Sequence, residues 1–367
     1  MAEIRIEHLH KGFGDFTAVR DSSLVLEDGK FVVLLGPSGC GKTTTLRMIA
    51  GLEYPSSGKI LLGGEDVTYR RPRERDIAMV FQLFALYPHM RVRENLSFPL
   101  RNEGLPKAVI AQRIAEVAAI LHIEHLLDMR VGGLSGGDRQ RIALGRAIVR
   151  KPKAFLMDEP LGTLDAEFRE RMCIELRKLH DRLGTTTVFV THDQNEAMAL
   201  ADHIVVMDKG EILQADTPEG IYHFPRNKFV AQFIGRPPMN FLPVQGALSP
   251  GDASVRIGSA TVAVPEAQSD SAAVTLGIRP EHVQFSDQGS LRGRVARSEY
   301  FGSHWIVNVA TAAGTIKVHG AKHACPAEGE HVGLAFQPAR AVLFDDASSM
   351  LLPSATTATH QTGMRHG

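Results

Sequence analysis

The first forty residues alternate between apolar and polar positions in a way that predicts strands. Residues 3–9 (EIRIEHL) and 17–26 (TAVRDSSLVL) place an apolar side chain at about every second position, which is typical of half-buried strands. Residues 30–36 (KFVVLLG) are almost uniformly apolar and predict a strand buried on both faces. These segments indicate the beginning of a β-sheet.

From residue 91 to about 150 the apolar pattern changes to that of helices. Residues 109–123 (VIAQRIAEVAAILHI), for example, place apolar side chains three and four positions apart. Short apolar strands follow at 154–159, 185–191 and 203–208, separated by helix-like stretches such as 168–183. Strands that alternate with helices predict a parallel sheet, here with a helical insert.

After residues 235–243 (GRPPMNFLP) the pattern of apolar and polar residues changes again. Short apolar segments bounded by glycine, proline and serine continue to about residue 336, and they predict a second, all-β domain built as a small barrel. Residues 354–367 (SATTATHQTGMRHG) lack apolar periodicity and predict a disordered tail.

Composition excludes several classes of protein. Lysine plus arginine equals aspartate plus glutamate, 41 against 41, so no net positive field attracts nucleic acid or an anionic membrane. No stretch approaches the ~20 apolar residues of a membrane-spanning helix, and residues 1–10 do not resemble a signal peptide. The 3 widely spaced cysteines favour a reducing compartment over a disulfide framework or a zinc site.

Residues 36–44 (GPSGCGKTT) match the phosphate-binding pattern GxxxxGK[ST] between a predicted strand and a predicted helix. Glycines allow backbone amides to fold around phosphate oxygens, and the helix amino end adds partial positive charge. Lys42 is expected to reach the β and γ phosphates, and Thr43 to hold Mg²⁺. The predicted ATP-binding residues of this loop are Gly36, Pro37, Ser38, Gly39, Cys40, Gly41, Lys42, Thr43 and Thr44.

The strand at 154–159 (AFLMDE) ends in two acids. Asp158 is expected to hold Mg²⁺ beside the phosphate loop, and Glu159 to act as the general base for the attacking water. A pair of acids at a strand end is often only solvated, but after a matched phosphate loop the catalytic interpretation is favoured.

A second anion-binding helix start lies about a hundred residues after the first. Residues 134–138 (LSGGD: Leu134, Ser135, Gly136, Gly137, Asp138) precede a helix-like stretch with free amides and a positive dipole end. From the residues alone this site binds either another phosphate ligand or the open side of the nucleotide on the first loop.

The ordered set GPSGCGKTT, Gln82, LSGGD, AFLMDEP, LGTLD and VTHD resembles the ABC transporter ATPases. The resemblance implies an α/β fold: a P-loop ATPase domain with a parallel-sheet core, an antiparallel β subdomain and a helical subdomain, then an all-β OB-like (TOBE) regulatory domain. The corresponding boundaries are 1–236, with the helical subdomain at about 91–150, and 237–353.

The resemblance also implies that two copies close head to tail around two ATP molecules. Ser135 and Gly137 would then touch the γ phosphate of the ATP bound by the partner copy, and Asp165, in LGTLD, would act across the dimer interface. The resemblance thus implies that the second anion site covers the open side of a nucleotide, the one bound by the other copy.

Further roles follow from the same resemblance. Phe13 occupies the aromatic position that stacks on adenine, Gln82 senses Mg²⁺ and the attacking water, and His192, in VTHD, grips the γ phosphate and orients Glu159. An exposed loop phenylalanine remains an alternative for Phe13. Two positions depart from the usual pattern: Asp138 replaces glutamine, and Gly162 replaces serine.

The resemblance is closest to the ATPases of bacterial importers for sugars and related solutes. Residues 81–90 (FQLFALYPHM) resemble the segment that faces the permease, with Tyr87, Pro88 and His89 as contact residues. The implied partners are a second copy, two transmembrane permease subunits and, indirectly, a substrate-binding protein, but no nucleic acid. The implied location is the cytoplasmic face of the inner membrane, peripherally attached.

The solute class stays open at this point. A carbohydrate, polyol or glycerol-phosphate-type solute is predicted, and the alternatives are an importer for iron, sulfate or polyamines and a soluble ATPase that acts on ribosomes or DNA.

Overall fold

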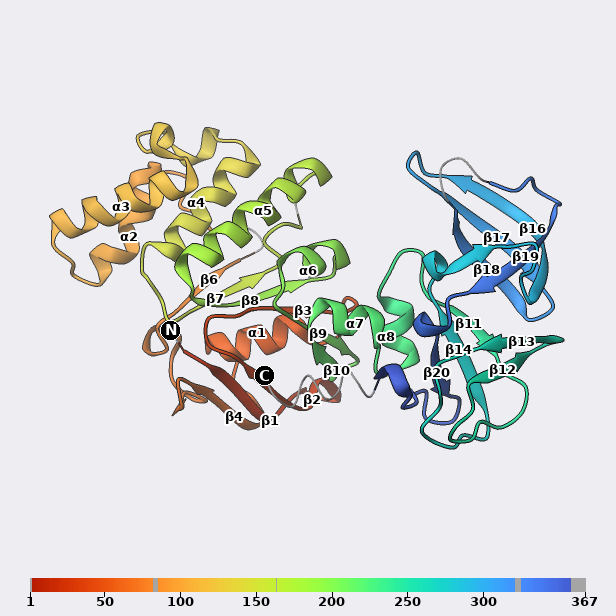
Figure 1. Ribbon diagram of the computed structural model, residues 1–367. Coiled ribbons are helices and arrows are strands. Elements are labelled where there is room, and N and C mark those ends of the chain that lie inside the picture. Colours follow the sequence, from red (N-terminus) through yellow and green to blue (C-terminus); the bar gives the residue numbers. More distant parts are fainter. Residues whose placement is uncertain (1, 82–84, 163, 321–324, 358–367) are drawn as a thin grey trace. The chain divides into compact units, whose positions relative to one another are not determined.

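The computed structural model describes residues 2–81, 85–162, 164–320 and 325–357, which fall into two compact units, 1–218 and 219–367 (Figure 1). Among the described residues, no helix is both long enough and apolar enough to cross a membrane.

The first unit is organised around a six-stranded sheet in the order β10-β9-β3-β8-β7-β6. All neighbours run parallel except β10, which pairs antiparallel with β9. The predicted parallel sheet is therefore confirmed. Its strands are β3 (Phe31–Leu35), β6 (Ile77–Val80), β7 (Ala154–Asp158), β8 (Thr186–Thr191), β9 (His203–Asp208) and β10 (Glu211–Asp216).

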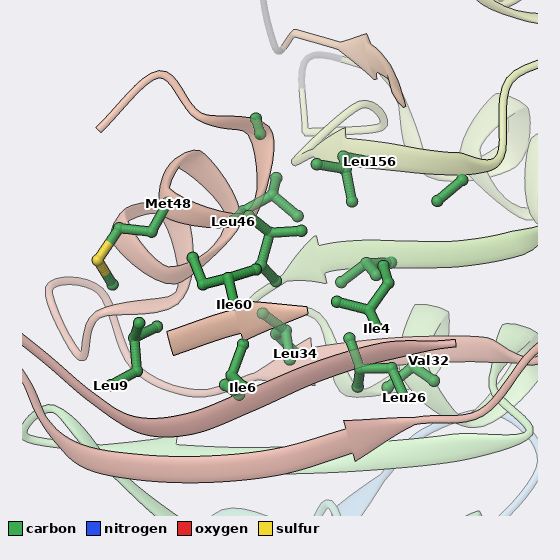
Figure 2. Close-up of a cluster of buried hydrophobic side chains, with 14 of the residues drawn as sticks. Ile4, Ile6, Leu9, Leu26, Val32, Leu34, Leu46, Met48, Ile60 and Leu156 are labelled. Atoms are coloured by element: carbon green, nitrogen blue, oxygen red, sulfur yellow. The ribbon is translucent and has the colours of Figure 1, made fainter. Parts of the chain in front are cut away.

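An antiparallel sheet packs against the same core. Its order is β2-β1-β4-β5, with strands β1 (Ile4–Phe13), β2 (Phe16–Leu26), β4 (Ser57–Leu62) and β5 (Glu65–Asp66). Figure 2 shows how Ile4 and Ile6 of this sheet meet Leu34 of the central sheet and Leu46 of helix α1 (Lys42–Ala50) in one apolar cluster. The helix that follows the phosphate loop is thereby fixed between two sheets.

Strand β4 was not predicted from the sequence. Its Gly58 has a φ of 95°, and a Cβ there would lie 2.3 Å from the carbonyl oxygen of His8. The strand is short and depends on close backbone approach to β1, which leaves little apolar periodicity in its sequence.

The helical insert is present as α2 (Val92–Asn102), α3 (Lys107–Leu121) and α4 (Gly136–Ile148). Helices α5 (Ala166–Leu183) and α6 (Gln194–Leu200) complete the first unit. In Figure 1, α5 lies on the face of the central sheet opposite α1. Alternation within β7 explains both layers, because Leu156 joins the α1 cluster whereas Phe155 and Met157 lie beside Leu176 of α5.

The second unit begins within the first turn of α7 (Pro218–His223), continues with α8 (Lys228–Phe233) and is then built of β-strands with short single-turn helices between them. Its sheets are β11-β14-β20, β12-β13 and β15-β19-β16-β17-β18, and every pairing in them is antiparallel. The strands are β11 (Asn240–Pro243), β12 (Ser254–Ile257), β13 (Ala260–Ala263), β14 (Val274–Ile278), β15 (Val283–Phe285), β16 (Leu291–Tyr300), β17 (Trp305–Thr311), β18 (Gly314–Gly320), β19 (His331–Phe336) and β20 (Val342–Asp345). The prediction of an all-β second domain is confirmed.

The division after Pro218 precedes the expected boundary at 236 because a buried arginine ties α7 and α8 to the β domain. Arg279 is only 2% exposed and donates to the carbonyl oxygens of Tyr222 (3.0 and 2.7 Å) and Ile234 (2.6 Å). Its guanidinium also stacks over the Tyr222 ring at 3.7 Å. These contacts join segments more than forty residues apart, which no sequence pattern reveals.

The expected disordered tail is wrong for its first four residues. Ser354 and Thr357 are buried, and the Ser354 amide donates to the Thr357 hydroxyl at 2.7 Å. Residues 358–367 lie outside the described residues.

Replacement of Arg279 by methionine should destabilise the second unit by about 2 to 4 kcal/mol, because buried carbonyls lose a charged donor. Chemical denaturation with Trp305 fluorescence, which reports on the second unit, measures this change. The control Arg297→Met removes an arginine whose side chain is 71% exposed and should shift the free energy of unfolding by less than about 0.5 kcal/mol. Equal losses in the two variants would contradict the role assigned to Arg279.

Candidate functional site

The predicted phosphate loop connects β3 to α1 and packs closely against the backbone of β9 and β2. A Cβ at Gly36 would lie 2.2 Å from the Met207 carbonyl oxygen, and one at Gly41, whose φ is 105°, would lie 2.4 Å from that of Ala18. Both positions therefore require glycine. At the tip of the loop, Ser38 and Gly39 are exposed, while Pro37, Thr43 and Thr44 are half-buried.

Lys42 begins helix α1 and is only 4% exposed. Its ammonium group donates to the carbonyl oxygens of Gly36 (2.8 Å) and Pro37 (2.9 Å). The loop thus folds around a positive charge, with the amino end of α1 directly beneath it.

Thr43 and Asp158 connect the phosphate loop to strand β7. The Thr43 hydroxyl donates to Asp158 Oδ1 at 2.9 Å, and Asp158 is 7% exposed. Burial raises the pKa of Asp158, while the hydrogen bond from Thr43 and the nearby Arg47 partly oppose this shift. Two oxygen atoms, a hydroxyl and a carboxylate, therefore converge at the base of the loop.

Glu159 and His192 meet at the carboxyl ends of β7 and β8. His192 Nδ1 lies 3.3 Å from Glu159 Oε2, and the Glu159 side chain is less exposed than the His192 ring. Glu159 adopts a φ of 45°, which is uncommon for a residue with a side chain, and its amide donates to the Val190 carbonyl at 3.1 Å. The sharp turn directs the carboxylate away from the strand and toward the next loop.

A partly buried network that the sequence did not reveal holds Thr191 and Asp193, the residues on either side of His192. The Thr191 hydroxyl donates to Glu196 at 2.6 Å and accepts from the Asp193 amide at 3.0 Å. Arg169 of α5 lies 3.4 Å from Asp193 and 3.5 Å from Glu196, and it donates to the Leu164 carbonyl at 2.8 Å. Arg169 therefore joins the LGTLD loop to the loop that carries His192.

Asp165 caps its own helix in this structure. Its Oδ1 accepts a hydrogen bond from the Phe168 amide at 2.9 Å, at the amino end of α5. Gly162 is exposed, and its amide donates to the Glu159 carbonyl at 3.3 Å.

The LSGGD segment forms the start of α4 in the helical insert. Leu134 is buried and Ser135 is exposed as the N-cap, with Gly136, Gly137 and Asp138 half-buried. A Cβ at Gly137 would lie 2.2 Å from the Phe168 ring, so this glycine allows α4 and α5 to approach closely. Among the described residues, the side-chain hydrogen bonds and the ion pair of this segment join Ser135, Asp138 and Arg141 and do not reach Lys42, Asp158, Glu159 or His192.

Phe13 lies at the end of β1, before the turn to β2, and 47% of it is exposed. The Lys11 ammonium group lies 4.8 Å from the centre of its ring. The ring is therefore an exposed aromatic surface beside a cation, as a stacking position requires, and its partner in the described part of the chain is Lys11 rather than the phosphate loop.

Tyr87, Pro88 and His89 lie just before α2, in contact with the helical insert. The Asn95 side chain binds both the amide and the carbonyl of Tyr87 (2.9 and 3.1 Å), and Arg146 lies over the Tyr87 ring at 5.5 Å. Pro88 and His89 are exposed. The predicted metal and water sensor Gln82 lies outside the described residues.

Cys40 should react slowly with iodoacetamide, because its thiol is 3% exposed and burial raises its pKa above the usual value of 9.0. At pH 7 we expect alkylation at least about tenfold slower than at the half-exposed Cys325, with the rate at Cys40 still rising above pH 9 as the thiolate forms. Peptide mass spectrometry over time measures both rates. Equal rates at pH 7 would contradict the buried, protonated thiol.

Comparisons with known proteins agree with this arrangement. Residues 19–162 match the family model for ABC transporters, 235–283 that for the MalK OB fold domain and 276–344 that for the TOBE domain. The second unit thus has the OB-like and TOBE character expected of it.

Several relatives match over most of their length. The chain is 55% identical over 291 residues to the trehalose import ATP-binding protein SugC of Mycobacterium tuberculosis (77% of this chain, 73% of that protein). It is 47% identical over 316 residues to the maltose/maltodextrin import ATP-binding protein MalK of Yersinia pestis (84% and 86%). It is 45% identical over 367 residues to the trehalose/maltose import ATP-binding protein MalK of Thermococcus litoralis (94% and 98%).

Among solved structures, a dimeric bacterial ABC transporter cassette is 30% identical and matches with a TM-score of 0.53, covering 59% of this chain and 98% of its own. The phosphate loop, the paired acids and the histidine loop meet at one edge of a parallel sheet, and the relatives match along most of the chain. The chain therefore belongs to the ABC transporter ATP-binding proteins.

Proposed function

We propose that the chain is the ATP-hydrolysing subunit of an importer for a carbohydrate, polyol or glycerol-phosphate-type solute. The observation that carries the ATPase part is the convergence of Lys42, the Thr43–Asp158 pair and the Glu159–His192 pair at the carboxyl ends of three neighbouring strands. The similarity to trehalose and maltose import proteins supports a carbohydrate as the transported solute.

The residues at the loop fit ATP and Mg²⁺. The Lys42 ammonium already donates to two loop carbonyls, and exchanging them for β and γ phosphate oxygens keeps charge-assisted hydrogen bonds. Thr43 and Asp158 offer the oxygen ligands that Mg²⁺ prefers, with Gln82 as a further candidate. When bound, Mg²⁺ would neutralise charge on the β and γ phosphates. The exposed ring of Phe13 would stack on adenine.

Glu159 acts in this proposal as the general base. It would accept a proton from the attacking water while His192, 3.3 Å away, orients the carboxylate and contacts the γ phosphate. His192 is itself positioned by the network of Thr191, Glu196 and Arg169, which restricts the loop at its base.

Closure of two copies completes each site. Ser135 and Gly137 lie at the start of α4, where an exposed N-cap and a positive dipole end are available to an anion from another molecule. In the proposed dimer they contact the ATP held by the partner's phosphate loop, and Asp165 lies at the same interface. The dimeric form of the related cassette supports this arrangement.

The segment with Tyr87, Pro88 and His89 is proposed to contact two transmembrane permease subunits, because it is exposed and held rigidly by Asn95 and Arg146. A periplasmic substrate-binding protein would deliver the solute to them. The subunit would then be attached peripherally to the cytoplasmic face of the membrane.

Purification from the native membrane tests the transport assignment. We expect recovery with two membrane proteins and ATPase activity that increases when a sugar-loaded binding protein is added. Recovery with ribosomes or DNA instead would favour the soluble ATPase, and stimulation by iron, sulfate or a polyamine would replace the carbohydrate.

Glu159→Gln should retain ATP binding while hydrolysis falls by at least about a hundredfold, because the general base is removed with little change of shape. Phosphate release measures turnover, and a fluorescent ATP analogue measures binding. The matched control Glu175→Gln alters a half-exposed carboxylate on α5 and should leave turnover unchanged. Normal turnover in Glu159→Gln would remove Glu159 from this role.

Ser135→Arg, combined with Glu159→Gln, should abolish ATP-dependent dimerisation, since a bulky cation would occupy the contact between the copies. Sedimentation velocity with and without ATP measures the dimer fraction. Ser57→Arg makes the same change at the exposed first residue of β4 and serves as the control. Undiminished dimerisation of the Ser135 variant would contradict the two-copy site.

A further inference from the structure

Asp138, the last residue of the LSGGD segment, uses both carboxylate oxygens within its own chain. Oδ2 accepts the hydrogen of the Ser135 hydroxyl at 2.7 Å, and Oδ1 accepts from Arg141 Nη2 at 2.9 Å. The Asp138 amide in turn donates to the Ser135 hydroxyl at 3.2 Å. We call Ser135, Asp138 and Arg141 the signature latch.

The latch changes what the start of α4 offers to an anion. A serine hydroxyl has one hydrogen, and here Asp138 accepts it, so Ser135 cannot donate to a phosphate at the same time. The carboxylate also lies in the first turn of α4, where its charge offsets the partial positive charge of the helix end. Both effects oppose binding of a phosphate at Ser135.

Arg141 provides a second position for the carboxylate. Its Nε is buried and has no hydrogen-bond partner among the described residues, and in a guanidinium group the Nε and Nη2 hydrogens point the same way. Oδ2 could therefore leave Ser135 and bind Nε while Oδ1 stays on Nη2, which gives a two-bond carboxylate–guanidinium pair.

From this geometry we propose that Asp138 is a positioning residue that controls release of the Ser135 hydroxyl to the nucleotide of a second copy, moving between Ser135 and Arg141. This inference rests on the proposed two-copy site. In this proposal Asp138 opposes ATP-driven closure of the two copies while it binds Ser135. Arg141 favours closure because it offers the carboxylate another partner.

The size of the restraint follows from the number of sites. Releasing one charge-assisted hydrogen bond corresponds to roughly tenfold in an equilibrium constant. A symmetric dimer contains two such sites, so loss of the restraint should raise the dimer association constant by about a hundredfold if the sites act independently.

The test uses the full chain carrying Glu159→Gln, with ATP and Mg²⁺, and measures the dimer association constant by sedimentation. Asp138→Asn, which keeps the shape and removes the charge, and Asp138→Ala, which removes the acceptor, should both raise the constant, by up to about a hundredfold. Arg141→Gln should lower it, because Asp138 then has only Ser135 as a partner. A purely structural role would not give opposite signs for Asp138 and Arg141.

Glu167→Gln is the matched control. Glu167 also lies in the first turn of a helix and pairs with an arginine one turn later, Arg171 at 2.8 Å, but among the described residues no hydroxyl group donates to Glu167. It should leave the association constant unchanged. Thermal unfolding of each variant identifies any that fails to fold. If one Asp138 variant fails to fold, the other Asp138 variant carries the test.

A double variant tests the route through Ser135. In a Ser135→Ala background the gain from Asp138→Asn should largely disappear, and a gain that persists in full would overturn the latch. An unchanged constant in both Asp138 variants, with the parent still dimerising on ATP, would overturn the latch alone. A parent that does not dimerise with ATP would overturn the two-copy proposal and the latch with it.

Discussion

The site depends on a constraint of parallel sheets: neighbouring strands end at the same edge. Strands β3, β8 and β7 are adjacent, so the loop after β3, His192 after β8 and the acids after β7 must all lie at that edge. The hydrogen bond from Thr43 to Asp158 fixes the two outer members of this set to each other. The loop that carries Lys42, the Thr43–Asp158 pair and Glu159 are thereby placed together at one edge of the sheet.

The core beneath this edge makes the placement rigid. Helix α1 packs between the antiparallel sheet and the central sheet, so its amino end, which carries Lys42 and Thr43, has little freedom. At its other end, the buried Arg75 donates to the carbonyl oxygens of Met48 and Ile49 at 2.7 and 2.8 Å. The last turn of the helix is thus satisfied by a side chain from a distant segment.

Two side chains of α5 connect the sheet edge to other parts of the first unit. Arg169 joins the loop before Asp165 to the loop of His192, so movement of one loop strains the other. Phe168, one residue earlier, packs against Gly137 at the start of α4. Helix α5 therefore contacts both the start of α4, through Phe168, and the loop of His192, through Arg169.

The sequence by itself determined the parallel sheet, the helical insert, the all-β second domain and the phosphate loop, because each has a local pattern of apolar residues or a motif of fixed spacing. Lys42, Asp158 and Glu159 could be named from the phosphate-loop motif and the acids at the end of the strand at 154–159, whereas His192 was named only through the resemblance to the ABC transporter ATPases. Only the tertiary structure decided that Arg169 binds the loop that carries His192. It alone decided that Arg279 binds α7 and the end of α8, and that Asp138 binds Ser135 and Arg141. The long-range contacts of Arg169 and Arg279 join segments far apart in the chain, and the orientation of a side chain such as Asp138 follows from competition among nearby donors, which sequence spacing does not encode.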